Sequence, residues 1–215
     1  DDGQSVYVLV SHHGNVHLHR IGLNGEIEQI TQGNRQVFGF SLDRNTGTIV
    51  VASTNPVNPG DLYLVHQNTG EEVQLTHVNE HILADLFVSQ PEEFWFEGVD
   101  GRKVQGWVMK PYGFQEGKKY PMVLEIHGGP HMMYSNSFFH EFQLLASEGY
   151  VVIYTNPRGS HGYGQAFVDA CRGDYGGGDY GDLMKGVDYA VVNFPYVDEA
   201  RMVVTGGSYG GFMTI

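Results

Sequence analysis

The sequence contains almost no cysteine, few basic residues and no long apolar stretch. Cys171 is the single cysteine among 215 residues, so no disulfide can form within the chain, and we expect a reducing, cytoplasmic location. Twelve Lys and Arg stand against 25 Asp and Glu, which gives a formal net charge of −13. Phosphate backbones and anionic lipid repel such a chain, so we expect binding to neither nucleic acid nor membrane surfaces. No apolar run reaches the roughly 18 residues that a membrane-spanning helix needs.

The N-terminus also lacks the usual features of a protein start. The first residues, DDGQSVYVLV, include no initiator Met and no basic segment followed by an apolar one. We therefore expect that the chain begins at a cut, and that a targeting signal could have been lost with the missing part.

Glycine is abundant, and in residues 1–90 it punctuates a β pattern. Short apolar runs alternate there with turn signals, with runs at 5–11, 16–23, 48–53 and 61–67. The turn residues Gly25 and Gly70 are 45 positions apart, as are Thr31 and Thr76. A repeat of this length indicates β-propeller blades, although two unrelated hairpins would give the same pattern. A propeller needs about 4–8 blades to close, so we expect more blades upstream.

From residue 91 to 215 the pattern changes to alternating strands and helices. Compact strands rich in β-branched residues are predicted near 106–111, 120–126, 150–155 and 200–205, with helices over 138–149 and 182–194 between them. This order predicts a mostly parallel sheet covered by helices, as in the first half of an α/β-hydrolase domain. The stretch 91–111 is interpreted as the crossing into this second domain.

A nucleophile signature lies near the end of the chain. The sequence Gly206-Gly207-Ser208-Tyr209-Gly210 fits G-x-S-x-G, follows the apolar run 201–204 and precedes a stretch that could open a helix. This context is that of a nucleophile elbow, in which a strained turn exposes the serine hydroxyl. The pattern predicts Ser208 as the nucleophile and the Tyr209 N–H as a donor to a developing oxyanion. In a glycine-rich chain the pattern alone also arises by chance.

Two further loops follow predicted strands. His127-Gly128-Gly129-Pro130 ends the strand before it, and an H-G-G turn at that position offers backbone N–H groups as the other half of an oxyanion hole. Arg158 lies in the loop TNPRGSHGYG, residues 155–164. This arginine could clamp a phosphate or a carboxylate, but we favour a structural role that anchors the turn.

In this order the motifs resemble the prolyl oligopeptidase family of serine peptidases, and within it the acylaminoacyl-peptidase-like branch. The resembling stretches run from about residue 60 to 214 and include VQGWVMKP, YPMVLEIHGGP, NPRGSHGYGQAF, DYGGGDYGDLMKGVDY and RMVVTGGSYGGFMT. The resemblance implies a β-propeller that filters access to an α/β-hydrolase domain. It also implies Ser208 as nucleophile, with the Tyr209 and Gly129 N–H groups as the oxyanion hole. Where relatives can carry a tyrosine that binds the oxyanion, this chain has His127, so the hole should rest on backbone donors.

The general base and the orienting carboxylate are not found after Ser208. In α/β-hydrolases the triad runs Ser, then Asp or Glu, then His, so both partners are expected downstream. His127, His131 and His161 lie upstream and are not expected to replace them. We therefore expect the remainder of the same polypeptide as a partner, and we expect this chain alone to be unstable and inactive.

The predicted function is a serine peptidase that hydrolyses short or N-acylated peptides through an acyl-enzyme on Ser208. A carboxylesterase and a non-catalytic propeller binding module are the alternatives. The 45-residue repeat argues against the first, and the intact Ser208 argues against the second. The sequence leaves open the substrate preference and whether the protein forms a homo-oligomer.

No metal or other cofactor is expected. His12, His13, His17 and His19 gather in one strand and turn, but no cysteine or carboxylate completes a metal site there. Asp179 and Asp182 in the acidic, glycine-rich stretch are interpreted as caps of the helix that follows.

Overall fold

The computed structural model describes residues 3–67 and 69–215 and divides the chain into two compact units. Unit 1 comprises residues up to Leu86 together with Ser135–Phe138, and unit 2 comprises Phe87–Tyr134 and Phe139–Ile215. The division thus falls four residues before the predicted boundary at 90. Asp1, Asp2 and Asn68, which belong to the predicted cut terminus and to the second hairpin turn, lie outside the described residues.

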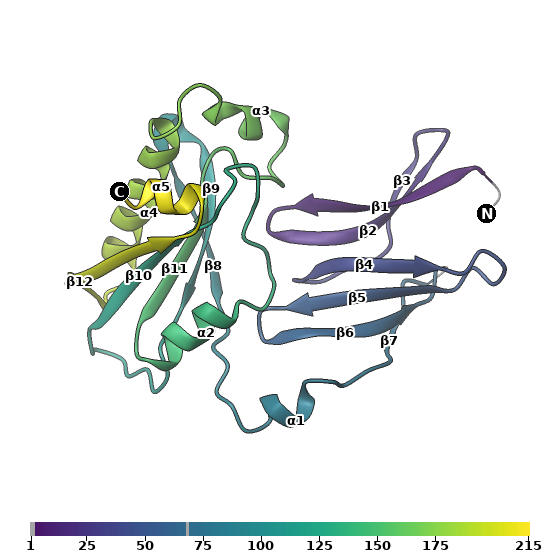
Figure 1. The fold of residues 1–215 in the computed structure, drawn as a ribbon, viewed down its shortest axis with the longest axis horizontal. Coiled ribbons are helices and arrows are strands. Elements are labelled where there is room, and N and C mark those ends of the chain that lie inside the picture. Colours follow the sequence, from purple (N-terminus) through teal and green to yellow (C-terminus); the bar gives the residue numbers. More distant parts are fainter. Residues whose placement is uncertain (1–2, 68) are drawn as a thin grey trace. The chain divides into compact units, whose positions relative to one another are not determined.

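Unit 1 is a seven-stranded sheet with the order β1-β2-β4-β5-β6-β7, in which β3 pairs with β2 (Figure 1). Its strands are β1 (Ser5–His12), β2 (Asn15–Gly22), β3 (Ile27–Gln29), β4 (Gln36–Leu42), β5 (Ile49–Asn55), β6 (Asn58–Val65) and β7 (Glu72–Gln74), followed by the short helix α1 (Glu80–Leu83). All pairings are antiparallel except the contact of β2 with β4, a single parallel bridge between Val16 and Gln36. The sheet is therefore two antiparallel groups, β1–β3 and β4–β7, joined at one point.

The 45-residue repeat has a structural counterpart in hydrogen bonds. The Leu18 N–H donates to Thr31 Oγ1 at 3.0 Å, and the Leu62 N–H donates to Thr76 Oγ1 at 2.9 Å. In both places a glutamine two residues before the threonine donates through Nε2 to the threonine carbonyl, at 2.8 Å. The two groups of strands thus end in the same way, so the repeat is structural and not a chance pair of hairpins.

Sequence patterns missed part of unit 1. The strand β4 has no predicted counterpart, because Gly39 interrupts its apolar alternation where the pairing with β5 shifts register. The residues between the predicted runs 48–53 and 61–67, where turn signals were expected, are mostly strand. Only Pro56 and Val57 form the turn between β5 and β6.

Unit 2 contains a five-stranded sheet with the order β12-β10-β11-β9-β8 (Figure 1). Its strands are β8 (Glu92–Glu97), β9 (Lys103–Met109), β10 (Tyr120–Ile126), β11 (Val151–Asn156) and β12 (Val197–Gly206). Its helices are η1 (Val99–Gly101), α2 (His140–Ser147), α3 (Gln165–Val168), η2 (Asp169–Cys171), α4 (Gly178–Asn193) and α5 (Tyr209–Met213).

The prediction of a mostly parallel sheet was wrong for this unit. Strands β11, β10 and β12 are parallel, whereas β8 and β9 join as antiparallel strands. The stretch interpreted as a crossing between domains is a hairpin, in which Asp100 and Gly101 adopt positive φ angles of 62° and 72°. So short a connection permits only antiparallel pairing.

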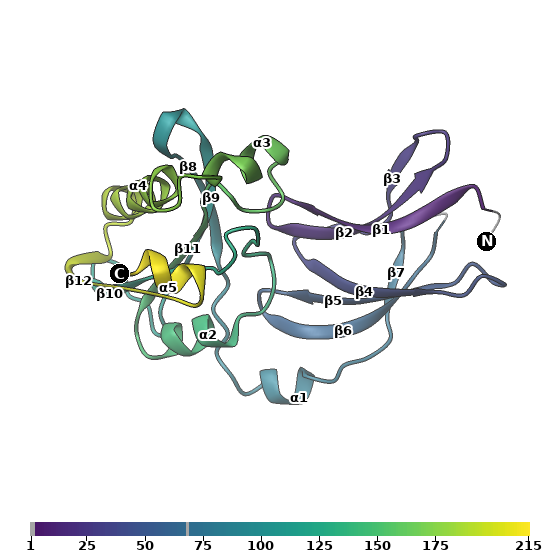
Figure 2. The same cartoon turned by 45° about the horizontal axis from the view of Figure 1, so that its top comes forward.

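Helices cover both faces of this sheet, with α4 on one side and α2 on the other (Figure 2). Alternate residues of β10 point to opposite faces: Leu124 belongs to the core beneath α4, and its neighbour Glu125 points to the α2 side. Each face buries its own aromatic-rich core, and together the two cores fix the strand ends that carry the site. No helix among the described residues is long and apolar enough to cross a membrane.

Candidate active site

Ser208 lies in a sharp turn between β12 and α5. Its backbone angles are φ 59° and ψ −119°, a region that side-chain-bearing residues rarely occupy. Such a conformation costs about 1–3 kcal/mol and persists only where the surroundings impose it. The side chain is exposed, and Ser208 Oγ makes no hydrogen bond to another described residue. The turn therefore presents a free hydroxyl at the end of the sheet.

The glycines on either side of Ser208 permit this turn by close backbone contact. A Cβ on Gly206 would lie 2.6 Å from the carbonyl oxygen of Ile126, and one on Gly210 would lie 2.0 Å from the same oxygen. A Cβ on Gly207 would meet nothing within 4 Å. The first and last glycines of G-x-S-x-G are thus required because β10 passes directly against the turn, whereas Gly207 has room for a larger residue.

The H-G-G-P turn lies beside the serine. A Cβ on Gly128 would lie 3.4 Å from Ser208 Cβ, and one on Gly129 would lie 2.6 Å from the backbone nitrogen of His131. Gly129 has φ 121°, which also favours glycine. The backbone N–H groups of Gly129 and Tyr209 donate no hydrogen bond to any other described residue. Both predicted oxyanion donors are therefore unengaged, next to an unengaged hydroxyl.

His127 is buried and contacts the turn, not the serine. Its Nδ1 lies 2.7 Å from the carbonyl oxygen of Gly128, and its Nε2 lies 2.9 Å from Ser160 Oγ. Burial lowers the pKa of His127, so the ring is neutral near pH 7. Since a carbonyl only accepts, Nδ1 carries the proton in its contact with Gly128, while the Ser160 hydroxyl donates to the carbonyl of Pro157 at 2.6 Å. The imidazole thus fixes the Gly128–Gly129 peptide unit, which carries the Gly129 N–H.

Arg158 does not face Ser208. Its guanidinium donates to both oxygens of Asp182, at 2.8 Å to Oδ2 and 2.9 Å to Oδ1, and to the carbonyl of Val99 at 2.8 Å. Asp182 is fully buried and also accepts from the Val99 N–H at 2.8 Å. The arginine ties the loop after β11 to α4 and to the β8–β9 hairpin. The interpretation of Asp182 as a helix cap was therefore wrong, because its carboxylate is committed to this ion pair.

Asp179 has a contact that the sequence pattern did not indicate. Its Oδ1 accepts from the N–H groups of Gly176 and Tyr180, each at 2.9 Å. Its Oδ2 accepts the phenolic hydrogen of Tyr209, the residue after the serine. Asp179 thus satisfies one first-turn N–H of α4, that of Tyr180, and Asp174 satisfies another, because its Oδ2 accepts from the Gly178 N–H at 3.0 Å. The tyrosine in the elbow motif was the available signal for this contact.

Two further histidines and the cysteine do not face Ser208. His131 Nδ1 lies 3.0 Å from the carbonyl of Gly159, and His17 Nδ1 lies 3.2 Å from Thr31 Oγ1. Within residues 3–67 and 69–215 no histidine hydrogen-bonds to Ser208 and no cluster of side chains could hold a metal ion. Cys171 is buried, and burial raises the pKa of its thiol, which disfavours the reactive thiolate.

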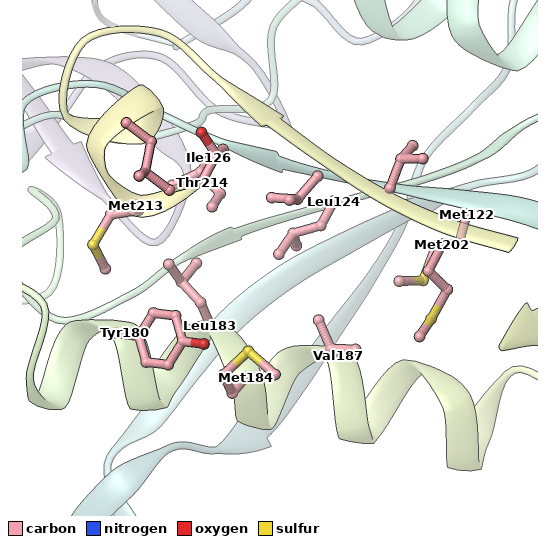
Figure 3. A pocket seen from close by; sticks show the side chains of 13 residues that line it. Met122, Leu124, Ile126, Tyr180, Leu183, Met184, Val187, Met202, Met213 and Thr214 are labelled. Carbon is pink, nitrogen blue, oxygen red and sulfur yellow. The ribbon is translucent and has the colours of Figure 1, made fainter. Parts of the chain in front are cut away.

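An apolar groove runs along the outer side of β12, between the sheet and α4 (Figure 3). It is lined on the sheet side by Leu124 and Met202, on the α4 side by Leu183 and Val187, and at the end near the serine by Met213. In this sheet β12 pairs with β10 alone, so one of its edges is open.

Comparisons with known proteins agree on one family. A profile of the prolyl oligopeptidase family matches residues 136–215. The uncharacterized peptidase YuxL of Bacillus subtilis is 45% identical over 213 residues, which are 99% of this chain and 32% of the relative. Dipeptidyl-peptidase 5 of Porphyromonas gingivalis is 36% identical over 215 residues, which cover 98% of this chain and 31% of the relative.

The solved structures give the same result. The acylaminoacyl peptidase of Pyrococcus horikoshii superposes with a TM-score of 0.90 at 35% identity, over 99% of this chain and 33% of that protein. The chain thus spans about a third of the length of the relatives it matches.

Proposed function

The chain belongs to the prolyl oligopeptidase family of peptidases, and from this premise we propose that it carries the nucleophile and oxyanion hole of a serine peptidase. Ser208 attacks the scissile carbonyl carbon, and the carbonyl oxygen becomes an oxyanion held by the Tyr209 and Gly129 N–H groups. Collapse of this intermediate releases the amine and leaves an acyl-enzyme, which water hydrolyses.

The observation that carries the proposal is the juxtaposition at the end of β12. An exposed serine hydroxyl in a strained turn lies beside two unengaged backbone N–H groups, one from each of two loops. A purely structural turn has no reason to retain a conformation that costs about 1–3 kcal/mol. Removal of one oxyanion donor in such sites lowers kcat by about 10²–10³, so this pair would supply much of the rate enhancement.

The base and the orienting carboxylate would come from the remainder of the polypeptide. The open edge of β12 and the apolar groove beside it are a surface on which further strands and a helix of an α/β-hydrolase domain could pack. Relatives three times as long leave room for those elements. This chain alone would then lack a proton acceptor for Ser208 and would be inactive.

Unit 1 is proposed to contribute blades to a β-propeller that limits access to the site. The repeated closing contacts of Thr31 and Thr76 support this proposal, because propeller blades are copies of one antiparallel unit. A propeller would admit short or unfolded peptides. The named relatives include acylaminoacyl and dipeptidyl peptidases, so the substrate class proposed here is short peptides, N-acylated ones among them.

Labelling with a fluorophosphonate probe tests the proposal. The complete polypeptide should be labelled, and Ser208→Ala should abolish labelling, while Ser89→Ala serves as a matched control at a buried serine. Ser89 bonds to Lys110 and Gln143, outside the site. The 215-residue chain expressed alone should not be labelled. Labelling that survives in Ser208→Ala, or its absence from the complete wild-type protein, would refute the catalytic role and favour a non-catalytic binding module.

Substrate comparison then separates the peptidase from the esterase alternative. Turnover of acetyl-aminoacyl, prolyl and free-amino dipeptidyl anilides, measured beside a simple ester, ranks the activities by kcat/KM. Hydrolysis of the ester with no measurable hydrolysis of any amide would support a carboxylesterase.

A further inference from the structure

Asp179 is a buried carboxylate placed directly behind the nucleophile turn. Its side chain has no solvent exposure, and its three donors are neutral: the N–H groups of Gly176 and Tyr180 and the phenol of Tyr209. The nearby guanidinium of Arg158 is committed to Asp182 and Asp100. Among the described residues Asp179 therefore has no cationic partner, although burying an uncompensated charge is costly.

The Asp179 carboxylate accepts a hydrogen bond from the Tyr209 hydroxyl. Burial and the Asp179 carboxylate raise the pKa of the Tyr209 phenol, so the O–H keeps its proton and donates it. Hydrogen bonds to an ionised acceptor are roughly twice as strong as neutral ones. The ring is also held by an edge contact with Tyr175, at 5.6 Å between centroids. The Tyr209 side chain is thus held at both its hydroxyl and its ring.

The backbone of Tyr209 is the element that the reaction would use. Its N–H belongs to the Ser208–Tyr209 peptide unit, whose carbonyl accepts from the Phe212 N–H at 3.1 Å. The α5 helix has only five residues, so this one bond gives the peptide plane little support. Because the phenol and the N–H belong to the same residue, anchoring the side chain restrains the backbone rotation that would turn the N–H out of position.

We propose that Asp179 is a positioning residue of the oxyanion hole, which holds the Tyr209 N–H in its working orientation through the phenol of the same residue. The proposal rests on the function proposed above for Ser208 and Tyr209. It assigns the acidic, glycine-rich stretch 173–182 a role beyond starting α4. His127 supports the Gly129 donor through the Gly128 carbonyl, so each of the two donors has its own side-chain support.

The test is a pair of conservative substitutions in the complete polypeptide. Tyr209→Phe keeps the ring and removes the hydroxyl, whereas Asp179→Asn keeps the shape and removes the charge. Each should lower kcat about tenfold, a part of the 10²–10³ that loss of a donor costs, with KM changed less than about twofold. The kcat of the double variant should be about the same as that of each single variant, because both substitutions break the same hydrogen bond.

A boronic acid peptide provides a readout that general destabilisation does not affect. Its tetrahedral adduct with Ser208 places an oxygen in the oxyanion hole, so its inhibition constant should rise by the same factor by which kcat falls. The matched control is Tyr120→Phe. Tyr120 is also buried, and its hydroxyl accepts from the Gln115 N–H at 2.8 Å, but it begins β10 at the end away from Ser208. This variant should lose thermal stability and keep kcat.

Each result has one interpretation. Unchanged kcat and boronate affinity in Tyr209→Phe, or a change in KM alone, overturns the positioning role while fluorophosphonate labelling of Ser208 leaves the proposed function intact. Additive losses in the double variant would show two independent effects and would also overturn it. A wild-type protein that the probe does not label refutes the proposed function itself, and the positioning role with it.

Discussion

Glu125 allows a quantitative prediction about stability and pH. This side chain lies on β10, in register with Tyr154 of β11, and Tyr154 is in turn in register with Trp107 of β9. Its Oε1 is buried without a hydrogen-bond partner among the described residues. Burial, and secondarily the negative charge of Glu141, raises the pKa of Glu125 from 4.5 to about 7. The folded protein therefore binds this proton more tightly than the unfolded chain does.

The sign and size of the effect follow by linkage. A carboxyl whose pKa is raised by folding favours the folded state below pH 4.5, and this contribution is lost as the pH rises through about 7. At 1.36 kcal/mol per pKa unit, the difference amounts to about 3 kcal/mol. Glu125→Gln has nearly the same shape and cannot ionise. Its free energy of unfolding should match the wild type near pH 4.5 and exceed it by about 1–3 kcal/mol at pH 8.

Urea unfolding at a series of pH values between 4.5 and 8 measures this difference. Tryptophan fluorescence is a suitable signal, because both tryptophans of this chain, Trp95 and Trp107, lie in unit 2. Glu116→Gln, at an exposed position in the loop after β9, removes the same charge and should show no such trend. If the advantage of Glu125→Gln does not grow with pH, the carboxylate is satisfied in solution and the reasoning from its burial is wrong.

Three further predictions concern the turn and its support. The methyl group of Gly210→Ala would lie 2.0 Å from a β10 carbonyl oxygen, so this variant should lose both probe labelling and cooperative melting. Gly207→Ala has room for its methyl group and should change the free energy of unfolding by less than about 0.5 kcal/mol. Similar circular-dichroism melts for the two variants would contradict this. Ser208→Gly should be about 1 kcal/mol more stable than Ser208→Ala in urea, because glycine tolerates φ 59°; equal midpoints would mean that the turn is unstrained. Arg158→Met should cost about 3–5 kcal/mol by leaving Asp182 buried and unpaired, and adding Asp182→Asn should recover part of it; a further loss would argue against charge as the cause.

Local patterns predicted most of the strands because their signal is local. The run 120–126 is continuously apolar apart from Glu125, as expected for a strand covered on both faces, and it forms an interior strand of the unit 2 sheet, between β12 and β11. Strand direction is not a local property. The β8–β9 pair became antiparallel because a tight turn at Asp100 joins the two strands, and the turn was visible in the sequence but was assigned to a domain crossing.

The backbone of the candidate site was predictable where close contacts require glycine. The spacing of Gly206 and Gly210 around Ser208 reflects one obstacle, the carbonyl of Ile126, and the structure brings Gly128 to the same place. Contacts between residues far apart in the sequence were harder to predict. The bonds of Arg158 to Asp182 and of Tyr209 to Asp179 span 24 and 30 residues, and nothing in the local spacing pairs these residues. Both aspartates stand near a helix start, which made capping the simplest local interpretation.

The matching contacts of Thr31 and Thr76 have a consequence for how such a chain can grow. Each threonine receives its hydrogen bond from a leucine of its own repeat, 13 or 14 residues earlier. A segment of about this size therefore contains both the donor and the acceptor of this hydrogen bond. Tandem duplication of the coding sequence can then insert or remove a whole segment without compensating changes elsewhere. A chimera that exchanges 16–31 with 60–76 should keep both threonine hydrogen bonds.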